Sequence, residues 1–314
     1  MNDSGGEIIM HKNFNHSLAV TVDIEDWYHI PSVCGSPFSV YKNTDEFFES
    51  WTDRYDYLTE PTHRVLDLLE KHEIKATFFV VADVVKRYPG LVEAIDKDGH
   101  EIACHGLHHA CKIDPKTKQP LISKEIFETN TKYAKDILEM CIAKPVNGYR
   151  APNALIAGWM IDSLSELGFL YDSSVSVNSL YSKSDSTLQK VSSHPYHIKS
   201  NSPFSGKKGE FTEFPWSYWN LLGIKIPTSG GPMLRFLGSN IILKGLKQSL
   251  IRGNTIFYFH PLDISNEIFP TIGNNRPFYW TIKGDIIEKR IKKIIEVIMD
   301  ENISIKPIQD QLED

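Results

Sequence analysis

The alternation of short apolar runs with helical patterns constrains this chain more than any other feature. Six β-rich runs cover residues 17–23, 75–81, 100–104, 146–150, 169–172 and 254–260. Helical patterns separate the first five of these runs, at residues 61–72, 89–97, 123–141 and 154–167. Strands that alternate with helices are typical of a parallel sheet whose faces are covered by the helices. We therefore predict an α/β fold, built as a parallel sheet or barrel.

The domain organisation predicted for the chain is a single catalytic domain over residues 1–314. This length allows one large domain or two small ones, and the sequence contains neither an internal repeat nor a glycine-rich nucleotide-binding motif. Residues 173–210 are rich in Ser, Lys and Asn, which indicates a polar insertion. Isoleucines at helical spacing predict a C-terminal helix at about residues 282–299.

Charge and composition argue against several classes of function and location. A net charge of −6 argues against a general nucleic-acid binder and against a binder of anionic membranes. The longest apolar stretch, residues 76–85, is too short for an integral membrane segment. The N-terminus lacks the basic and apolar regions of a signal peptide, and the four scattered cysteines are typical of reduced thiols. We expect a cytoplasmic protein, and paired disulfides are the alternative for the cysteines.

A His-Gly-Leu-His-His segment follows the third predicted strand. His105 and His109 would face the same point if this segment formed one helical turn. Neutral imidazoles paired in this way are common ligands of a divalent metal. Two histidines at this spacing, taken alone, are more often surface residues. The prediction of a metal site therefore depends on partners elsewhere in the chain.

Side chains that can bind a metal or transfer a proton lie at the ends of several other predicted strands. They are Asp23, Glu25 and Asp26 after the first strand, and Arg150, Asp172 and His260 after later ones. Each alone has a structural explanation, as a turn residue, a surface ion pair or a core histidine. Carboxyl ends of parallel strands meet in one crevice, so together these residues are expected to form one site. Two histidines and a carboxylate suit a hydrolytic metal, a further carboxylate can accept a proton from water, and a histidine can protonate a leaving amine.

Five motifs in this order resemble the polysaccharide deacetylase family, the homology domain shared with rhizobial chitooligosaccharide deacetylases. They are residues 21–26, 105–109, 149–152, 171–174 and 259–261, and the resemblance covers roughly residues 17–265. The segments 213–216 and 229–232 are similar to a bacterial subgroup associated with surface-polysaccharide loci. The family resemblance implies a distorted, incomplete (β/α) barrel. It also implies removal of N-linked, sometimes O-linked, acetyl groups from sugars with a divalent metal.

The resemblance also implies roles for four catalytic residues. Asp23 would be the general base, and Arg150 would hold it in place. His260 would be the general acid, and Asp172 would orient its ring.

The metal ligands implied by the resemblance are His105, His109 and one acid of the first motif. The family usually has two adjacent aspartates followed by glycine there, whereas this chain has Asp23, Glu25 and Asp26. Strand alternation places Asp23 and Glu25 on the same face, which favours Glu25 as the ligand. A β-bulge would present Asp26 instead. Such a ligand set favours Zn²⁺, with Co²⁺, Ni²⁺ and Fe²⁺ as alternatives.

The substrate predicted from these motifs is an N-acetylated amino sugar in a bacterial surface glycan or its precursor. Trp27, directly after the acids, is predicted to stack on the sugar, and Pro152 of the third motif to contact it. Two alternative functions stay open. One is a related C–N hydrolase acting on a small cyclic amide or formamide, and the other is a non-catalytic glycan-binding module. The sequence does not indicate an oligomeric state.

Overall fold

An eight-stranded sheet forms the centre of the protein in a computed structural model that describes residues 15–50, 56–117, 119–177, 192, 194–198, 211–268 and 281–312. The strands are β1 (Leu18–Ile24), β2 (Thr77–Val80), β3 (Glu101–Cys104), β4 (Gly148–Tyr149), β5 (Tyr171–Asp172), β6 (Tyr196–Ile198), β7 (Phe211–Glu213) and β10 (Thr255–Phe259). Their order is β10-β1-β2-β3-β4-β5-β7-β6, and every pair is parallel except β6 with β7. Within the described residues, β10 and β6 do not pair, so the barrel is open. The predicted incomplete (β/α) barrel is confirmed.

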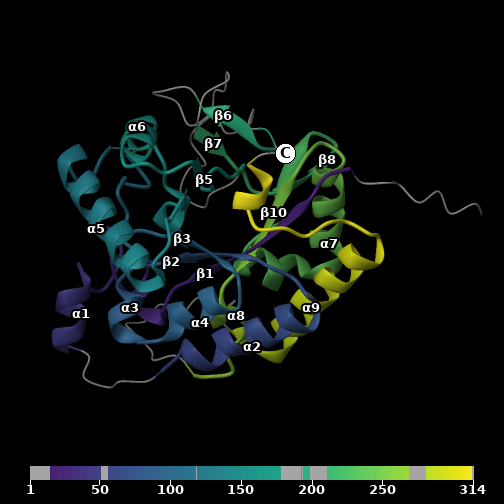
Figure 1. The fold of residues 1–314 in the computed structure, drawn as a ribbon, viewed down its shortest axis with the longest axis horizontal. Helices are drawn as coiled ribbons and strands as arrows, with labels where there is room; N and C mark the ends of the chain where they lie inside the picture. The colour runs from purple at the N-terminus through teal and green to yellow at the C-terminus, as the bar shows by residue number, and fades with distance from the viewer. Residues whose placement is uncertain are drawn as a thin grey trace, which may run out of the picture.

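Helices surround this sheet on its outer side (Figure 1). They are α1 (Thr44–Ser50), α2 (Thr59–Lys71), α3 (Val84–Arg87), α4 (Leu91–Lys97), α5 (Lys124–Ile142), α6 (Gly158–Glu166), α7 (Gly231–Leu250), α8 (Pro261–Ile264) and α9 (Asp285–Asp300). Short 3-10 helices lie at η1 (Trp27–His29), η2 (Pro152–Ala154) and η5 (Gln309–Gln311), and β8 (Tyr218–Leu221) pairs with β9 (Ile224–Pro227) as a separate hairpin. In Figure 1, α5 and α6 lie to the left of the sheet and α7 to its right.

The first strand illustrates how the sheet delivers polar groups to the interior of the barrel. All seven residues of β1 are buried. Val20 and Val22 belong to the large cluster that packs against the helices, whereas Ala19 packs with Phe79 inside the barrel. Successive side chains of a strand point to opposite faces, so Asp23 shares the inner face with Ala19. A strand that looks uniformly buried can therefore carry a catalytic acid on its inner face.

The predicted C-terminal helix at about residues 282–299 corresponds to α9, which begins at Asp285 and ends at Asp300. Its buried residues are Ile287, Ile291, Ile294, Ile295 and Ile298, the apolar side that the helical spacing predicted. The polar insertion predicted at 173–210 lies mostly outside the described residues. A single domain over the whole chain stays a prediction.

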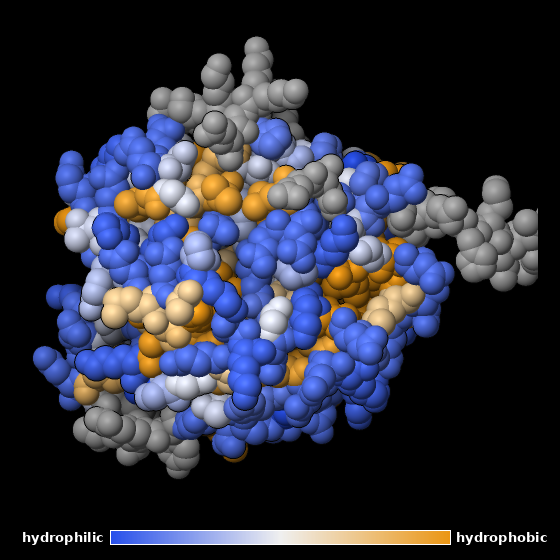
Figure 2. All heavy atoms as spheres, viewed as in Figure 1, coloured by the Kyte–Doolittle hydropathy of each residue, from blue (hydrophilic) through white to orange (hydrophobic). Residues whose placement is uncertain are grey.

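The surface shown in Figure 2 is mostly hydrophilic, and hydrophobic side chains gather in separate patches, one of them over the region of α7. Among the residues described, no helix combines the length and the apolar character needed to cross a membrane. The four cysteines are free thiols.

Candidate metal centre

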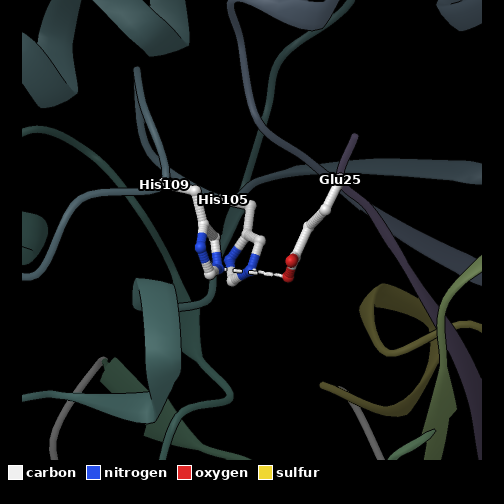
Figure 3. A group of neighbouring side chains, drawn as sticks. All are labelled: Glu25, His105 and His109. Atoms are coloured by element: carbon white, nitrogen blue, oxygen red, sulfur yellow. Dashed lines mark hydrogen bonds and ion pairs between the residues drawn. The ribbon is translucent and has the colours of Figure 1, made fainter. Parts of the chain in front are cut away.

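Glu25, His105 and His109 converge at the carboxyl ends of β1 and β3. Glu25 Oε1 lies 3.0 Å from His105 Nε2 and 3.1 Å from His109 Nε2. Figure 3 shows the three side chains pointing at one another, Glu25 from the end of β1 and the two histidines from the loop after β3. All three are buried, so water competes little for their polar atoms. The trio has the geometry of a candidate metal centre.

The outer ring nitrogens of both histidines fix which nitrogen faces the centre. His105 Nδ1 lies 2.8 Å from the carbonyl oxygen of Arg150, and His109 Nδ1 lies 2.9 Å from that of His29. A carbonyl oxygen only accepts, so each Nδ1 carries hydrogen and each neutral ring presents a lone pair at Nε2.

Those two lone pairs and the Glu25 carboxylate form a cluster of acceptors that needs a cation. Burial lowers the pKa of His109, which favours its neutral form. His109 Nε2 is buried and makes no hydrogen bond, although it lies close to Glu25. Acceptors that face one another without protons are unfavourable unless a cation lies between them. The residues therefore fit a divalent metal held by two imidazoles and one carboxylate.

The segment carrying the two histidines is a bent loop, so His105 and His109 converge without the helical turn that their spacing would have allowed. Gly106 has φ of 85°, a left-handed conformation that suits glycine and interrupts a right-handed helix. Backbone hydrogen bonds from Ala82 to Gly106 and from Asp83 to Leu107 hold the loop against the end of β2. His108 points elsewhere, and its Nδ1 lies 2.7 Å from Asp83.

Asp26 is turned away from the centre, which separates the two acids that the sequence left open as ligands. Its carboxylate accepts hydrogen bonds from the Trp27 amide at 2.7 Å, from Arg87 Nε at 3.0 Å and from the Tyr88 hydroxyl. The β1 strand continues to Ile24 without a bulge, so alternation leaves Asp23 and Glu25 on the inner face. The structure brings Glu25, and not Asp26, to the two histidines.

Asp23 and Arg150 form the buried ion pair that the sequence predicted. Arg150 Nη1 lies 2.6 Å from Asp23 Oδ1 and 3.0 Å from Thr21 Oγ1. Its remaining donors reach the Ser173 carbonyl and hydroxyl oxygens, and the guanidinium lies 3.9 Å from the centre of the Phe79 ring. Because one carboxylate oxygen of Asp23 is held in this way, the direction of the other is fixed.

His260 lies on the far side of Asp23 and Glu25, at the start of α8. Its Nε2 is 3.6 Å from Glu25 Oε1 and 3.9 Å from Asp23 Oδ2, and its Nδ1 is 3.0 Å from Asp263 Oδ2. Burial opposes protonation of His260, but the carboxylates of Asp263, Glu25 and Asp23 outweigh it and raise its pKa to about 9. The ring is therefore held as a charged donor that faces the centre.

The prediction that Asp172 orients His260 was wrong, because the partner of His260 is Asp263. Asp172 accepts hydrogen bonds from the amide and hydroxyl of Ser174 and lies opposite Glu213, since β5 pairs with β7. His260 follows β10, which four strands separate from β5 in the sheet. A His-x-x-Asp spacing at a helix start is the sequence signal that would have found Asp263.

Arg235 of α7 completes this side of the site. Its Nη2 lies 2.6 Å from Asp263 Oδ1, and its Nε donates to the carbonyl oxygen of Ile282. Although burial favours the neutral acid, Arg235 and His260 hold the pKa of Asp263 well below its usual range. Arg235 was not among the residues predicted from the sequence.

These side chains open into one cavity of about 220 Å³. Its polar wall includes Asp23, Glu25, His105, His109 and His260, and its less polar wall includes Trp216, Met233 and Leu262. Trp216 also donates its indole hydrogen to the Ser173 carbonyl oxygen at 2.8 Å, so Ser173 links its ring to Arg150.

The two residues predicted to contact substrate, Trp27 and Pro152, do not line this cavity. The η1 turn directs Trp27 into a buried cluster, where its ring lies 5.2 Å from Phe47 and 5.9 Å from Tyr57. Pro152 is buried against the loop at Gly106. Trp216 lines the cavity instead, and nothing in the sequence had distinguished it from the other aromatic residues as a substrate contact.

Replacing Trp27 by Ala is expected to lower the free energy of unfolding by about 3–5 kcal/mol, because a buried aromatic side chain leaves a cavity behind. Urea unfolding measures this loss. The metal affinity of the folded fraction should remain near that of the wild type. Unchanged stability together with weakened sugar binding would instead restore Trp27 to the substrate site.

Two adjoining segments of the chain match the models of known families. Residues 50–171 match the polysaccharide deacetylase family, and residues 175–301 match a domain of unknown function, DUF3473. The first segment contains His105, His109 and Arg150, and the second contains His260 and Asp263. The candidate centre therefore draws on both segments.

Two curated relatives match part of the chain. A chitooligosaccharide deacetylase of Rhizobium leguminosarum bv. trifolii is 34% identical over 124 residues, which cover 36% of this chain and 51% of that protein. A peptidoglycan-N-acetylglucosamine deacetylase of Bacillus cereus is 31% identical over 97 residues, which cover 30% of this chain and 45% of that protein. The chain thus spans about half the length of the curated relatives it matches.

A solved structure from Mycobacterium smegmatis, described as a "putative polysaccharide deacetylase", has the same fold. It superposes with a TM-score of 0.62 at 19% identity, over 95% of this chain and 90% of that one.

Proposed function

We propose that this chain, which belongs to the polysaccharide deacetylase family, hydrolyses the N-acetyl group of an amino sugar in a bacterial surface glycan or its precursor. One observation carries the proposal. The Glu25–His105–His109 trio shares a single cavity with the Asp23–Arg150 and His260–Asp263 pairs. A ligand set, a base and an acid in one cavity suit hydrolysis of an amide bond.

Glu25, His105 and His109 would hold the metal, and Zn²⁺ suits their donor atoms best. A bound divalent ion of this kind lowers the pKa of water and polarises a carbonyl group. His105 and His109 are oriented for this task by the backbone carbonyls of Arg150 and His29, so that little reorganisation accompanies binding.

Asp23 accepts the proton of the attacking water in this proposal. Its Oδ1 is engaged by Arg150, which leaves Oδ2 directed toward the cavity and toward His260. The Arg150 guanidinium, buried and held by Ser173, keeps the carboxylate in one orientation while the proton moves. Arg150 therefore acts as a positioning residue.

His260 donates a proton from Nε2 to the leaving amine of the sugar. Asp263 binds the opposite ring nitrogen, which fixes the ring and stabilises its charged form. Trp216, Met233 and Leu262 form the apolar part of the cavity, which suits the acetyl methyl group and one face of a sugar ring.

An acetate-release assay with metal analysis tests the proposal. Chitooligosaccharides, sugar nucleotides and lipid-linked glycans serve as candidate substrates, and a cyclic ureide and a formamide serve as competing ones. Acetate release from an N-acetylated sugar is expected. Cleavage of the ureide or formamide alone would point to the related C–N hydrolase, and tight glycan binding without turnover, even with added metal, to a non-catalytic module. A cytoplasmic location stays a prediction.

The pH dependence of kcat/KM provides a separate expected result. His260 must be protonated to act as the acid, and although burial opposes protonation, the Asp263 carboxylate raises the pKa of the ring, so activity should fall as pH rises through that pKa. Asp263→Asn removes the adjacent negative charge and should move this alkaline limb to lower pH by about one unit or more. Asp263→Glu keeps the charge and is the matched control. An alkaline limb that Asp263→Asn leaves in place would contradict the assignment of His260.

A further inference from the structure

The β8–β9 hairpin and the second half of α7, which contacts it, form a surface that the proposed chemistry does not use. Between Glu213 and Asp263 the chain has no Asp or Glu, although its net charge is −6. The same stretch carries five lysines and arginines, which are Lys225, Arg235, Lys244, Lys247 and Arg252. Arg235 is engaged with Asp263 inside the cavity, and Lys247 pairs with Glu301. The hairpin and helix are therefore a basic region on an acidic protein.

The hairpin has one apolar face, and the two residues of that face next to the turn are open to solvent. Trp219 lies opposite Ile226, and Leu221 lies opposite Ile224. Side chains of directly opposed residues share a face, so these four lie together. Leu221 is 40% exposed and Ile224 67% exposed. Exposed apolar groups clustered in this way mark interaction surfaces in soluble proteins.

The turn of this hairpin places a leucine where the backbone disfavours it. Leu222 and Gly223 have φ of 51° and 91°. Two-residue turns with positive φ at both positions favour Asn-Gly, and a leucine there is strained. Leu222 is also 97% exposed, so its side chain contributes no packing to the fold. The strain at Leu222 lowers stability and the exposed side chain does not offset it, which points to a role outside folding.

Basic side chains surround the rings at the base of the hairpin, which is fixed to α7. Lys244 lies 5.5 Å from the Trp219 ring, while Lys225 and Arg252 lie 4.8 Å and 4.7 Å from the Tyr218 ring. The backbone N–H of Asn220 donates to Gln248 Oε1 at 2.7 Å, and Gln248 Nε2 donates to the backbone carbonyl oxygen of Asn220 at 3.1 Å. The apolar residues next to the turn and the basic residues beside the rings are therefore fixed relative to one another by the contact between the hairpin and α7.

We propose that the β8–β9 hairpin, with the adjacent side of α7, is a docking surface for an anionic lipid bilayer. Leucine and isoleucine at the tip would enter the boundary between headgroups and acyl chains, and Lys225 and Lys244 would pair with anionic headgroups. Two copies of this chain that met symmetrically through the surface would bring Lys225 and Lys244 of one copy toward the same lysines of the other. A soluble anionic glycan would leave the apolar tip in water.

Docking through the hairpin would also bring the catalytic cavity close to the bilayer. Pro227 at the end of β9 and Pro232 and Met233 in the first turn of α7 line that cavity. The docking surface and the cavity mouth therefore share structural elements. The docking proposal does not depend on which bond the cavity hydrolyses.

Vesicle co-sedimentation of the full chain tests this proposal. Wild-type protein should bind vesicles of phosphatidylglycerol mixed with phosphatidylcholine, bind pure phosphatidylcholine weakly, and lose binding as salt screens the charges. Leu222→Asn suits the turn and should preserve folding, yet lower the partition coefficient by about tenfold or more. Adding Ile224→Thr should lower it further, and Lys244→Gln should reduce binding to the anionic vesicles selectively.

Met140→Gln is the matched control, since Met140 is 84% exposed on α5, and α5 lies across the molecule from β8 (Figure 1). This variant should bind vesicles as the wild type does. Failure of the wild type to bind anionic vesicles at low salt would overturn the proposal, as would undiminished binding of the Leu222→Asn/Ile224→Thr variant. Light scattering that showed self-association, abolished by the same double variant, would assign the surface to a second copy instead.

Discussion

Asp23→Asn is expected to reduce acetate release by about 10²- to 10⁴-fold, the usual contribution of a general base, while the metal stays bound. Asn has the shape of Asp but cannot accept the proton of the attacking water. The metal ligands are Glu25, His105 and His109 in this proposal, so the substitution leaves them in place. Steady-state kinetics and metal analysis of the same preparation measure both quantities.

Stability must be followed in the same experiment, because Arg150 is fully buried and would lose its carboxylate partner. Removal of one member of a buried ion pair typically costs about 3–5 kcal/mol. Thr21→Val provides a control, since it removes another contact of Arg150 without touching the base. It should cause only a modest loss of activity. Full activity of folded Asp23→Asn protein would refute the assigned mechanism.

Glu25→Gln and Asp26→Asn are expected to behave in opposite ways. Glu25→Gln removes the anionic ligand between the two histidines and should weaken metal binding by more than about 100-fold, above the loss typical of outer-shell changes. Asp26→Asn should leave metal affinity unchanged. It should instead lower the free energy of unfolding by about 1–3 kcal/mol, because Arg87 and Tyr88 lose an ionised partner.

Zinc titration and urea unfolding of both variants measure this contrast. The two substitutions make the same chemical change one residue apart, so each serves as the control of the other. Loss of metal in Asp26→Asn with retention in Glu25→Gln would reverse the assignment of the ligand. Loss of metal binding in both variants would show that Glu25 and Asp26 both contribute to the metal site, which would require a different backbone conformation at the first motif.

Much of the site could be predicted because the carboxyl ends of parallel strands meet at one edge of a sheet. This rule holds whatever the order of the strands. It predicted that Asp23, Glu25 and Arg150 would lie near the histidines after β3 and β10, as the structure shows. Alternation along β1 also favoured Glu25 over Asp26 before any fold was known.

The partners of individual side chains were harder to predict. Asp172 and His260 both follow strands, yet β5 pairs with β7 while β10 pairs with β1. The tautomer of His109 depends on the carbonyl oxygen of His29, eighty residues away. No local pattern specifies such contacts.

The sequence by itself determined the alternation of strands and helices, and with it the edge of the sheet where polar residues gather. Only the tertiary structure decided that Asp263 orients His260, that Trp27 is a core residue and that Trp216 lines the cavity. Periodicity is a local property of the backbone, and it specifies which way a side chain points. Strand order and the path of loops depend on packing between distant segments, so they decide what each side chain meets.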